Sequence, residues 1–166
     1  MYESGTYIVY GVQGVCKVIG TEKQLVNRKR TEFLVLEPLV KSESRFYVPT
    51  QNPTAMNKIL QVLSREDLES LIASPELREE CWVSHENIRK QQYRELLSSG
   101  NRMQILRMVC ALYRYKDEQI AAGKKFHQID DNFLRDAERL ICSEISLVME
   151  KTMEESREYL RSNLRA

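Results

Sequence analysis

Residues 7–19 read YIVYGVQGVCKVI, and this stretch decides the class of the N-terminal fold. It holds two runs of β-branched and aromatic residues, which favour strands, separated by Gly11 and Gly14. Glycine allows the positive φ of a tight connection, so the two runs are predicted to pair. Two further strands are predicted at residues 33–36 and 45–48. Polar connections are predicted before each of them, at residues 21–31 and 41–44. Strands this short cannot bury a two-layer sandwich, but they can curl into a small barrel.

The sequence from Asn52 onward indicates helices instead. Polar N-caps followed by proline or by acidic residues are typical helix starts, and they occur at Asn52-Pro53, Ser64-Arg65-Glu66-Asp67 and Ser74-Pro75. Gly100-Asn101 is predicted to end one helix and begin the next, which continues to Gly123. We expect Asp130 or Asp131 to cap a long final helix, with residues 154–166 as its frayed tail.

Strands followed by helices, without alternation, predict an α+β fold with segregated halves. The N-terminal half is expected to be a small β-barrel, and the C-terminal half an all-α domain. The predicted boundary divides the chain into residues 1–63, which include a short linker helix, and residues 64–166.

The charge of the chain is nearly balanced in total but not along the sequence. The 166 residues contain 25 Lys and Arg against 24 Asp and Glu, which excludes a histone-like polycation. Residues 82–125 hold nine basic and four acidic side chains, so this segment carries +5. The segments before and after it, residues 71–81 and 126–166, carry −2 and −3. The helical half is therefore polarised along its sequence.

Signals for catalysis are weak. The chain has no G-x-S-x-G, H-E-x-x-H or phosphate-binding glycine loop, and no C-x-x-C among its four cysteines. Cys81 and His85, four residues apart, could form a thiol nucleophile on one helical face, although a buried Cys81 beside a surface His85 is the favoured interpretation. We expect no enzyme, metal, cofactor or small-molecule substrate. With no apolar run of membrane length and no signal peptide, a cytoplasmic protein is expected. We also expect a monomer.

Binding residues stand out more clearly. Trp82 begins the basic segment, where it could pack in the core or stack on a nucleic-acid base. The cations that could contact DNA phosphates beside it are Arg89, Lys90, Arg94, Arg114, Lys124 and Lys125. The Arg28-Lys29-Arg30 cluster between two strands could meet an acidic protein surface or form a solvated loop.

Several motifs together resemble the CarD/CdnL family of bacterial transcription regulators. In the N-terminal half these are VYGVQGVCKV at 9–18, FLVLEP at 33–38 and YVP at 47–49. The same module resembles the polymerase-interacting domain of transcription-repair coupling factors. In the helical half the resemblance continues through residues 94–101, 112–114, 123–125, 130–131, 137–138 and 143–144. It covers about residues 5–150.

The resemblance implies a Tudor-like, SH3-like barrel that docks on the β subunit of RNA polymerase. Some relatives use an arginine for docking where this chain has Tyr47, and Arg45 is the nearest cation on the same face of the strand. We therefore expect polymerase contacts from Arg28, Lys29, Arg30, Arg45 and Tyr47. The resemblance also implies a helical domain that touches promoter DNA. Trp82 lies about one helical turn earlier than the family's wedge tryptophan, relative to the Ser-Gly-Asn turn at Gly100.

The resulting hypothesis is a regulator that binds polymerase through the barrel and contacts promoter DNA at the upstream edge of the bubble, modulating the stability of the open complex. Two other classes stay open. One is a polymerase-binding adaptor that does not touch DNA, and the other is the Cys81/His85 thiol enzyme. Charge reversal at Arg89, Lys90 and Arg94 is expected to separate the regulator from the adaptor, because only the regulator needs those cations.

Overall fold

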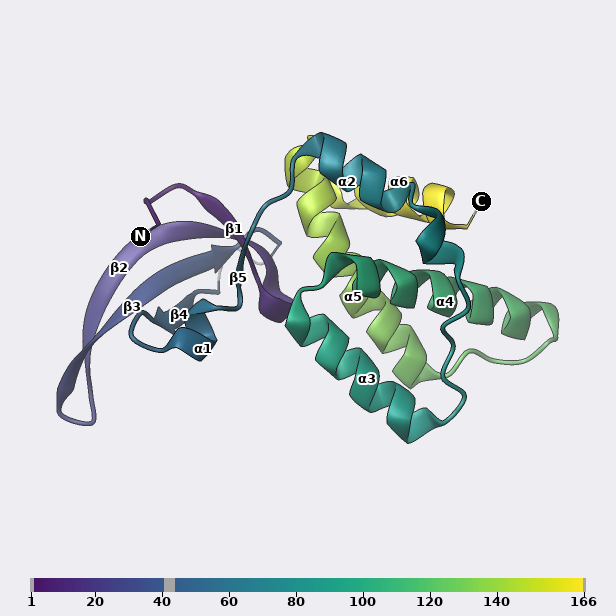
Figure 1. Ribbon diagram of the computed structural model, residues 1–166, viewed down its shortest axis with the longest axis horizontal. Helices are drawn as coiled ribbons and strands as arrows, with labels where there is room; N and C mark the ends of the chain where they lie inside the picture. The colour runs from purple at the N-terminus through teal and green to yellow at the C-terminus, as the bar shows by residue number, and fades with distance from the viewer. Residues whose placement is uncertain (1, 41–43, 166) are drawn as a thin grey trace. The chain divides into compact units, whose positions relative to one another are not determined.

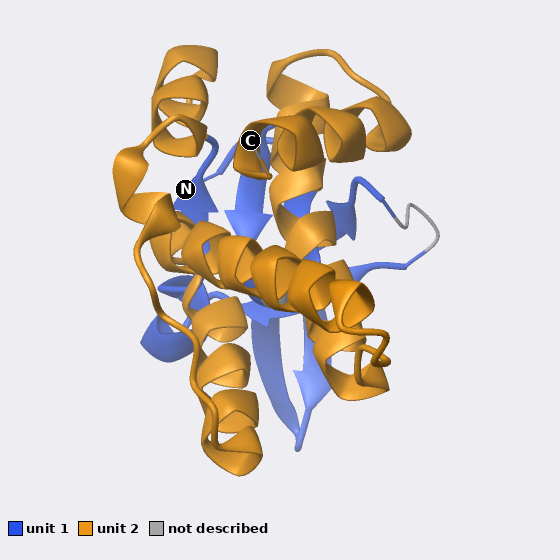
Figure 2. Cartoon of the chain, turned by 90° about the vertical axis from the view of Figure 1, so that its right-hand side faces the viewer, with its two compact units in different colours: residues 1–62 blue, residues 63–166 orange. Residues whose placement is uncertain are grey.

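The computed structural model describes residues 2–40 and 44–165. The chain divides into two compact units, residues 1–62 and residues 63–166, which we call the sheet unit and the helical unit (Figure 2). All the strands belong to the sheet unit and precede the helices of the helical unit, as the α+β prediction requires, with one short helix between the last two strands (Figure 1). Within the described residues, every helix is too short or too polar to serve as a membrane span.

The sheet unit is one antiparallel sheet of five strands in the order β4-β3-β2-β1-β5. The strands are β1 (Tyr7–Tyr10), β2 (Gly14–Val26), β3 (Lys29–Pro38), β4 (Phe46–Pro49) and β5 (Ile59–Gln61). The short helix α1 (Pro53–Met56) follows β4, and Asn52 caps it by accepting a hydrogen bond from the Ala55 amide. β4 and β5 form the two edges of the sheet, and pairing between them, which would close the predicted barrel, is not shown among the described residues.

The main buried cluster of the sheet unit lies on one face of this sheet, although Val9, Val15 and Val35, which point to the other face, are also buried. It consists of the side chains of Ile8, Cys16, Val18, Leu34, Leu36, Val48 and Ile59, with Ala55 and Met56 of α1 packed against them. Burial of these side chains stabilises the unit because each removes apolar surface from water.

The polar stretch 21–31 is not the loop that its composition suggested. β2 and β3 stay paired through it, from Thr21 opposite Leu34 to Val26 opposite Lys29. Only Asn27 and Arg28 turn the chain, both with positive φ, at 49° and 65°. Two-residue turns of this kind match the right-handed twist of the strands that they join. The prediction was wrong because an exposed two-stranded ribbon needs no apolar face, so it lacks the alternation by which strands are recognised.

Arg28 occupies a turn position that favours glycine, so the substitution Arg28→Gly is expected to stabilise the sheet unit. A side chain at positive φ costs about 1 kcal/mol, and glycine avoids that cost. Thermal unfolding should show a higher midpoint for Arg28→Gly than for the wild type. Lys29→Gly, one residue later and inside β3, serves as the control and should lower it. A lower midpoint for Arg28→Gly would contradict the turn assignment.

The helical unit contains five α-helices and one 3₁₀ helix among its described residues. They are α2 (Arg65–Ile72), the 3₁₀ helix Pro75–Arg78, α3 (Glu86–Ser99), α4 (Arg102–Ala121), α5 (Gln128–Val148) and α6 (Met153–Leu164). The predicted caps at Ser64 and Asn101 are present, since their side chains accept hydrogen bonds from the Asp67 and Gln104 amides. The apolar faces of these helices form one core, in which Leu106, Val109 and Leu112 of α4 are fully buried.

Two predictions for the end of the chain were wrong. α5 begins at Gln128, so Asp130 and Asp131 lie inside its first turn rather than at its cap. Residues beyond 152 do not fray as a tail, because Thr152 and Glu155 form a reciprocal capping box that starts α6. Leu160 of α6 is fully buried in the core, so this helix is an integral part of the helical unit.

Candidate interaction surfaces

Strand alternation divides the side chains of β3 between two faces of the sheet. Leu34 and Leu36 belong to the core, so Phe33 and Glu37 point to the opposite face. We call that opposite face the outer face; its side chains include Lys29, Phe33, Glu37, Arg45 and Tyr47.

An aromatic pair, the exposed Tyr47 and the half-buried Phe33, lies on the outer face. Tyr47 is 43% exposed, and its ring meets that of Phe33 edge to face, with 6.3 Å between centroids and 88° between planes. Beside it, the Arg45 Nε lies 3.7 Å from Glu37 Oε2. Exposed tyrosine and arginine side chains are the residues that most often anchor protein–protein interfaces. The outer face therefore has the chemistry of a protein-binding surface.

The structure distributes the basic cluster of the β2–β3 hairpin over both faces. Lys29 pairs with Val26, and alternation along β3 places it on the outer face. Arg30 pairs with Leu25 on the opposite face, and Arg28 lies in the turn. Of the five residues predicted to bind polymerase, Lys29, Arg45 and Tyr47 thus share a face, whereas Arg30 does not.

Trp82, in the helical unit, is half-buried between two partners. The Tyr115 ring of α4 stacks on it, with 4.0 Å between centroids and 18° between planes. The Arg89 guanidinium carbon lies 4.5 Å from the indole centroid. Two groups this close cannot share one face of an indole, so both faces are covered. A cavity of about 380 Å³ borders the ring, and its lining includes His127. In this arrangement a nucleic-acid base could reach Trp82 from the cavity, but it could not stack on the indole ring.

Arg89, which the sequence suggested as a phosphate contact, is only 6% exposed. Its Nε and Nη2 each donate a 2.9 Å hydrogen bond to one carboxylate oxygen of Asp130, which is 1% exposed. Its Nη1 donates to the Val83 carbonyl oxygen at 3.0 Å. These bonds join the start of α3 to the start of α5. We therefore correct the role of Arg89: it is a structural cation that positions Trp82.

Two more of the predicted DNA-binding cations are paired within the unit. The Lys90 Nζ lies 3.5 Å from Glu86, one turn away on α3. The Arg114 Nη1 lies 3.4 Å from Glu80, and its Nη2 donates to the Arg78 carbonyl oxygen at 3.1 Å. Exposed pairs of this kind contribute little stability, and their side chains can exchange one anion for another.

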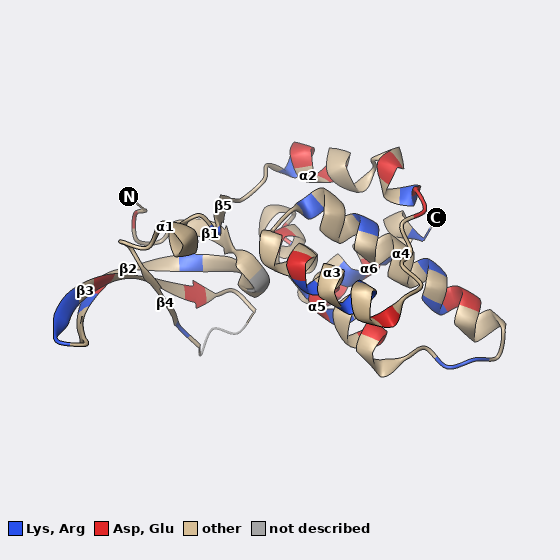
Figure 3. Ribbon diagram, turned by 60° about the horizontal axis from the view of Figure 1, so that its bottom comes forward, with Lys and Arg blue, Asp and Glu red and all other residues tan. Residues whose placement is uncertain are grey.

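The acidic flanks seen in the sequence pair with much of the basic segment between them. Six of its nine cations are paired, five of them with carboxylates of the flanks and Lys90 with Glu86 of the segment itself; the pairs are Arg89–Asp130, Lys90–Glu86, Arg102–Glu144, Arg107–Glu79, Arg114–Glu80 and Lys116–Asp131. Arg94, Lys124 and Lys125 are exposed and have no ion-pair partner among residues 2–40 and 44–165. Figure 3 shows basic and acidic residues mixed along the helices. The segment charge of +5 therefore overstates the charge available to a phosphate backbone.

Comparison with known families identifies the sheet unit. Residues 2–60 match the model of the CarD-like/TRCF RID domain, from before β1 into β5. The sheet unit is a CarD-like/TRCF RID domain. The match confirms the resemblance for the N-terminal half of the chain and indicates RNA polymerase as the partner of the RID domain, whereas the resemblance of the helical half stays a prediction. No curated protein matches the chain.

Sequence reasoning missed the partners of the key aromatic side chains. Phe33 was assigned to a strand of the RID domain, but its contact with Tyr47 depends on the register of β3 and β4. Tyr115 was assigned no role, although it supports Trp82. Trp82 and Tyr115 are 33 positions apart, so their stacking depends on the tertiary structure. The sequence offered one weak signal for Tyr115, a cluster of aromatic residues near the end of the predicted helix.

The geometry does not favour the alternative of a thiol nucleophile. Residues 80–85 are not helical, so the premise that Cys81 and His85 share a helical face was wrong. The His85 Nδ1 accepts a 3.4 Å hydrogen bond from the Ile88 amide and caps α3. Burial raises the pKa of the Cys81 thiol, and the nearby Arg107 only partly opposes this shift. A raised pKa reduces the thiolate that a nucleophile requires.

Thiol labelling at pH 7.5 tests this directly. All four cysteines are expected to react more slowly in the folded protein than free cysteine does. Burial raises the pKa of Cys16 and Cys142 to about 12 and that of Cys110 to about 11, so their thiolate forms are scarce. Mass spectrometry after timed alkylation identifies each site, and denaturant should remove the protection. A Cys81 that reacts faster than free cysteine would revive the enzyme hypothesis.

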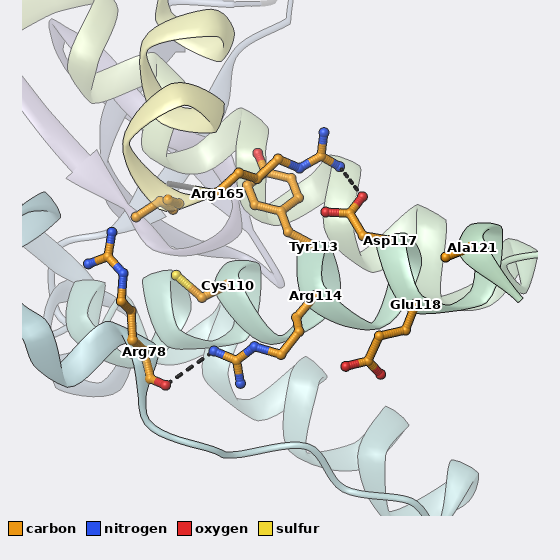
Figure 4. Close-up of a pocket in the computed structure, with 9 residues that line it drawn as sticks. Arg78, Cys110, Tyr113, Arg114, Asp117, Glu118, Ala121 and Arg165 are labelled. Carbon is orange, nitrogen blue, oxygen red and sulfur yellow. Dashed lines mark hydrogen bonds and ion pairs between the residues drawn. The ribbon is translucent and has the colours of Figure 1, made fainter.

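A second cavity, of about 440 Å³, lies between the 3₁₀ helix, α4 and α6 (Figure 4). Three arginines line it, and all three are engaged in contacts within the unit. Arg165 lies 3.3 Å from Asp117, while Arg114 donates to the Arg78 carbonyl. The Arg78 side chain donates to the Asn163 carbonyl. Among the described residues, no group of three or more His, Cys, Asp or Glu side chains is placed to hold a metal ion.

Proposed function

We propose that this chain is a non-enzymatic transcription regulator. Its RID domain binds the β subunit of RNA polymerase through the outer face, and its helical unit contacts promoter DNA at the upstream edge of the bubble. One observation carries the proposal: the RID match coincides with an exposed tyrosine, Tyr47, which packs against the half-buried Phe33 and is flanked by Arg45. The resemblance of the sequence to CarD/CdnL regulators supports the β subunit and the position on DNA.

Tethering explains how a nearly neutral protein can act on DNA. Polymerase bound to the RID domain raises the effective concentration of the helical unit at the promoter, so weak phosphate contacts are sufficient. Arg94, Lys124 and Lys125 are the exposed cations that support this role in the helical unit. Three phosphate contacts predict a slope of about −3 for log affinity against log salt. Preferential contact with melted DNA would then shift the equilibrium toward the open complex.

The lifetime of promoter open complexes tests the DNA contact. The wild-type protein is expected to change this lifetime at saturating concentration. The triple variant Arg94→Gln/Lys124→Gln/Lys125→Gln should lose most of the effect, because it lacks three phosphate contacts of the helical unit, while its affinity for polymerase stays unchanged. The conservative variant Arg94→Lys retains the charge and should retain the effect. An unchanged lifetime with the wild-type protein would refute the mechanism.

The alternative function, a polymerase-binding adaptor without DNA contact, has one observation in its favour. The ion pairs that neutralise six of the nine cations leave the helical unit with little charge for DNA. For an adaptor, the triple variant would behave as the wild type in every promoter assay. The same experiment therefore separates the two functions. It is used in place of charge reversal at Arg89, because that change would break the buried ion pair with Asp130 and destabilise the helical unit.

A further inference from the structure

The β2–β3 hairpin continues beyond the rest of its sheet. β1 pairs with β2 only as far as Lys17, and β4 pairs with β3 only as far as Phe33. Residues 23–31 therefore form a two-stranded arm, closed by the turn at Asn27 and Arg28, with no third strand paired to it among the described residues (Figure 1). Two-stranded ribbons without a covering layer gain little from burial, so their side chains are available to a partner.

The arm is strongly basic. Its four cations are exposed, and residues 23–31 contain no acidic side chain; the cations are Lys23, Arg28, Lys29 and Arg30. None of the four has an ion-pair partner in the part of the chain that the structure describes. The nearest acidic residues in the sequence, Glu22 and Glu32, lie where the arm leaves the sheet, and Glu32 is the cross-strand neighbour of Lys23. The cations with no carboxylate opposite them are therefore Arg28, Lys29 and Arg30. Figure 3 shows the resulting block of positive charge at the tip of the hairpin.

Charge and apolar surface occur on both faces of the arm. Leu25 pairs with Arg30 on one face and is 74% exposed. Val26 pairs with Lys29 on the other face and is 40% exposed. A flat protein surface can meet only one face of a ribbon. A groove of duplex DNA presents a phosphate backbone on each side of an inserted element, and the major groove is wide enough for a two-stranded β-ribbon.

We propose that this arm enters a groove of duplex DNA. Its cations, which lie on both faces of the ribbon, contact phosphates on both sides of the groove. Phosphate contacts dominate the affinity, so the arm binds with little sequence preference. This inference goes beyond the proposed function, because it assigns a DNA contact to the RID domain and needs none of the cations of the helical unit.

The test uses the full chain and a fluorescein-labelled duplex of 20 base pairs, with anisotropy measured over a series of KCl concentrations. The arm variant is Lys23→Gln/Arg28→Gly/Arg30→Gln, in which glycine keeps the turn. We expect about tenfold weaker binding at low salt and a slope of log affinity against log salt that is smaller by about 3. The charge-conserving variant Lys23→Arg/Arg28→Lys/Arg30→Lys should bind as the wild type does, which controls for folding.

The matched control removes three cations elsewhere, as Arg94→Gln/Lys124→Gln/Lys125→Gln. If only this control weakens duplex binding, the proposed function stands and the arm proposal is wrong. If the arm variant keeps wild-type affinity and slope, or if the wild-type protein does not bind the duplex at the lowest salt, the proposal is overturned. Loss of polymerase binding by the arm variant, with duplex binding intact, would show that the arm meets an acidic protein surface instead.

Discussion

Replacement of Asp130 with alanine is expected to destabilise the helical unit by about 3–5 kcal/mol, because it leaves the buried guanidinium of Arg89 without its counter-ion. Urea unfolding measures the effect, and the fluorescence of Trp82 reports it selectively, since this single tryptophan lies directly against Arg89. The midpoint should fall, and the folded-state emission should change as the indole loses its fixed neighbour.

Two controls make the Asp130→Ala result specific. Glu86→Ala removes an exposed carboxylate that pairs with Lys90, and it should cost about 0.5 kcal/mol or less. The double replacement Arg89→Met/Asp130→Leu removes both charges and should recover much of the lost stability, because no unpaired ion stays buried. A loss of less than about 1 kcal/mol of unfolding free energy in Asp130→Ala would contradict this account, because it would mean that water or another acceptor binds the Arg89 guanidinium.

Tyr47→Ala is expected to weaken the binding of the full chain to RNA polymerase by about 30-fold. An exposed tyrosine at the centre of an interface contributes about 2 kcal/mol when a partner covers it, and Tyr47 is the most exposed aromatic side chain of the pair on the outer face. Biolayer interferometry with immobilised core polymerase measures the affinity.

Arg30→Gln is the matched control for Tyr47→Ala, since Arg30 belongs to the same sheet but points away from the outer face. Its affinity for polymerase should equal that of the wild type. Equal losses for the two variants would show that polymerase binds the hairpin rather than the outer face. No loss for Tyr47→Ala would remove the outer face from the proposed interface.

Local signals predicted much of the fold. The N-caps at Asn52, Ser64 and Asn101 and the turn at Gly100 appear where the sequence placed them, because capping depends on a few adjacent residues. The start of α6 could have been found in the same way, since Thr152 and Glu155 have the spacing of a capping box. It was missed because the surrounding residues are polar.

The candidate surfaces were harder to predict, because ion pairing depends on contacts between distant residues. Arg89 and Asp130 are 41 positions apart, and only the tertiary fold brings them together. One local signal was available: Arg89 precedes Tyr93 and Leu97 at intervals of four, so it continues the buried stripe of α3. A sum of charges over residues 82–125 counts such buried cations as if they faced solvent.

The binding of the full chain to polymerase tests the central claim most directly. A labelled wild-type chain is titrated with core RNA polymerase, and an isolated fragment of the β subunit is then added as competitor. We predict saturable binding at one chain per polymerase, and complete displacement by the β fragment. Absence of binding, or binding that the β fragment does not displace, would contradict the assignment of the RID domain to the β subunit.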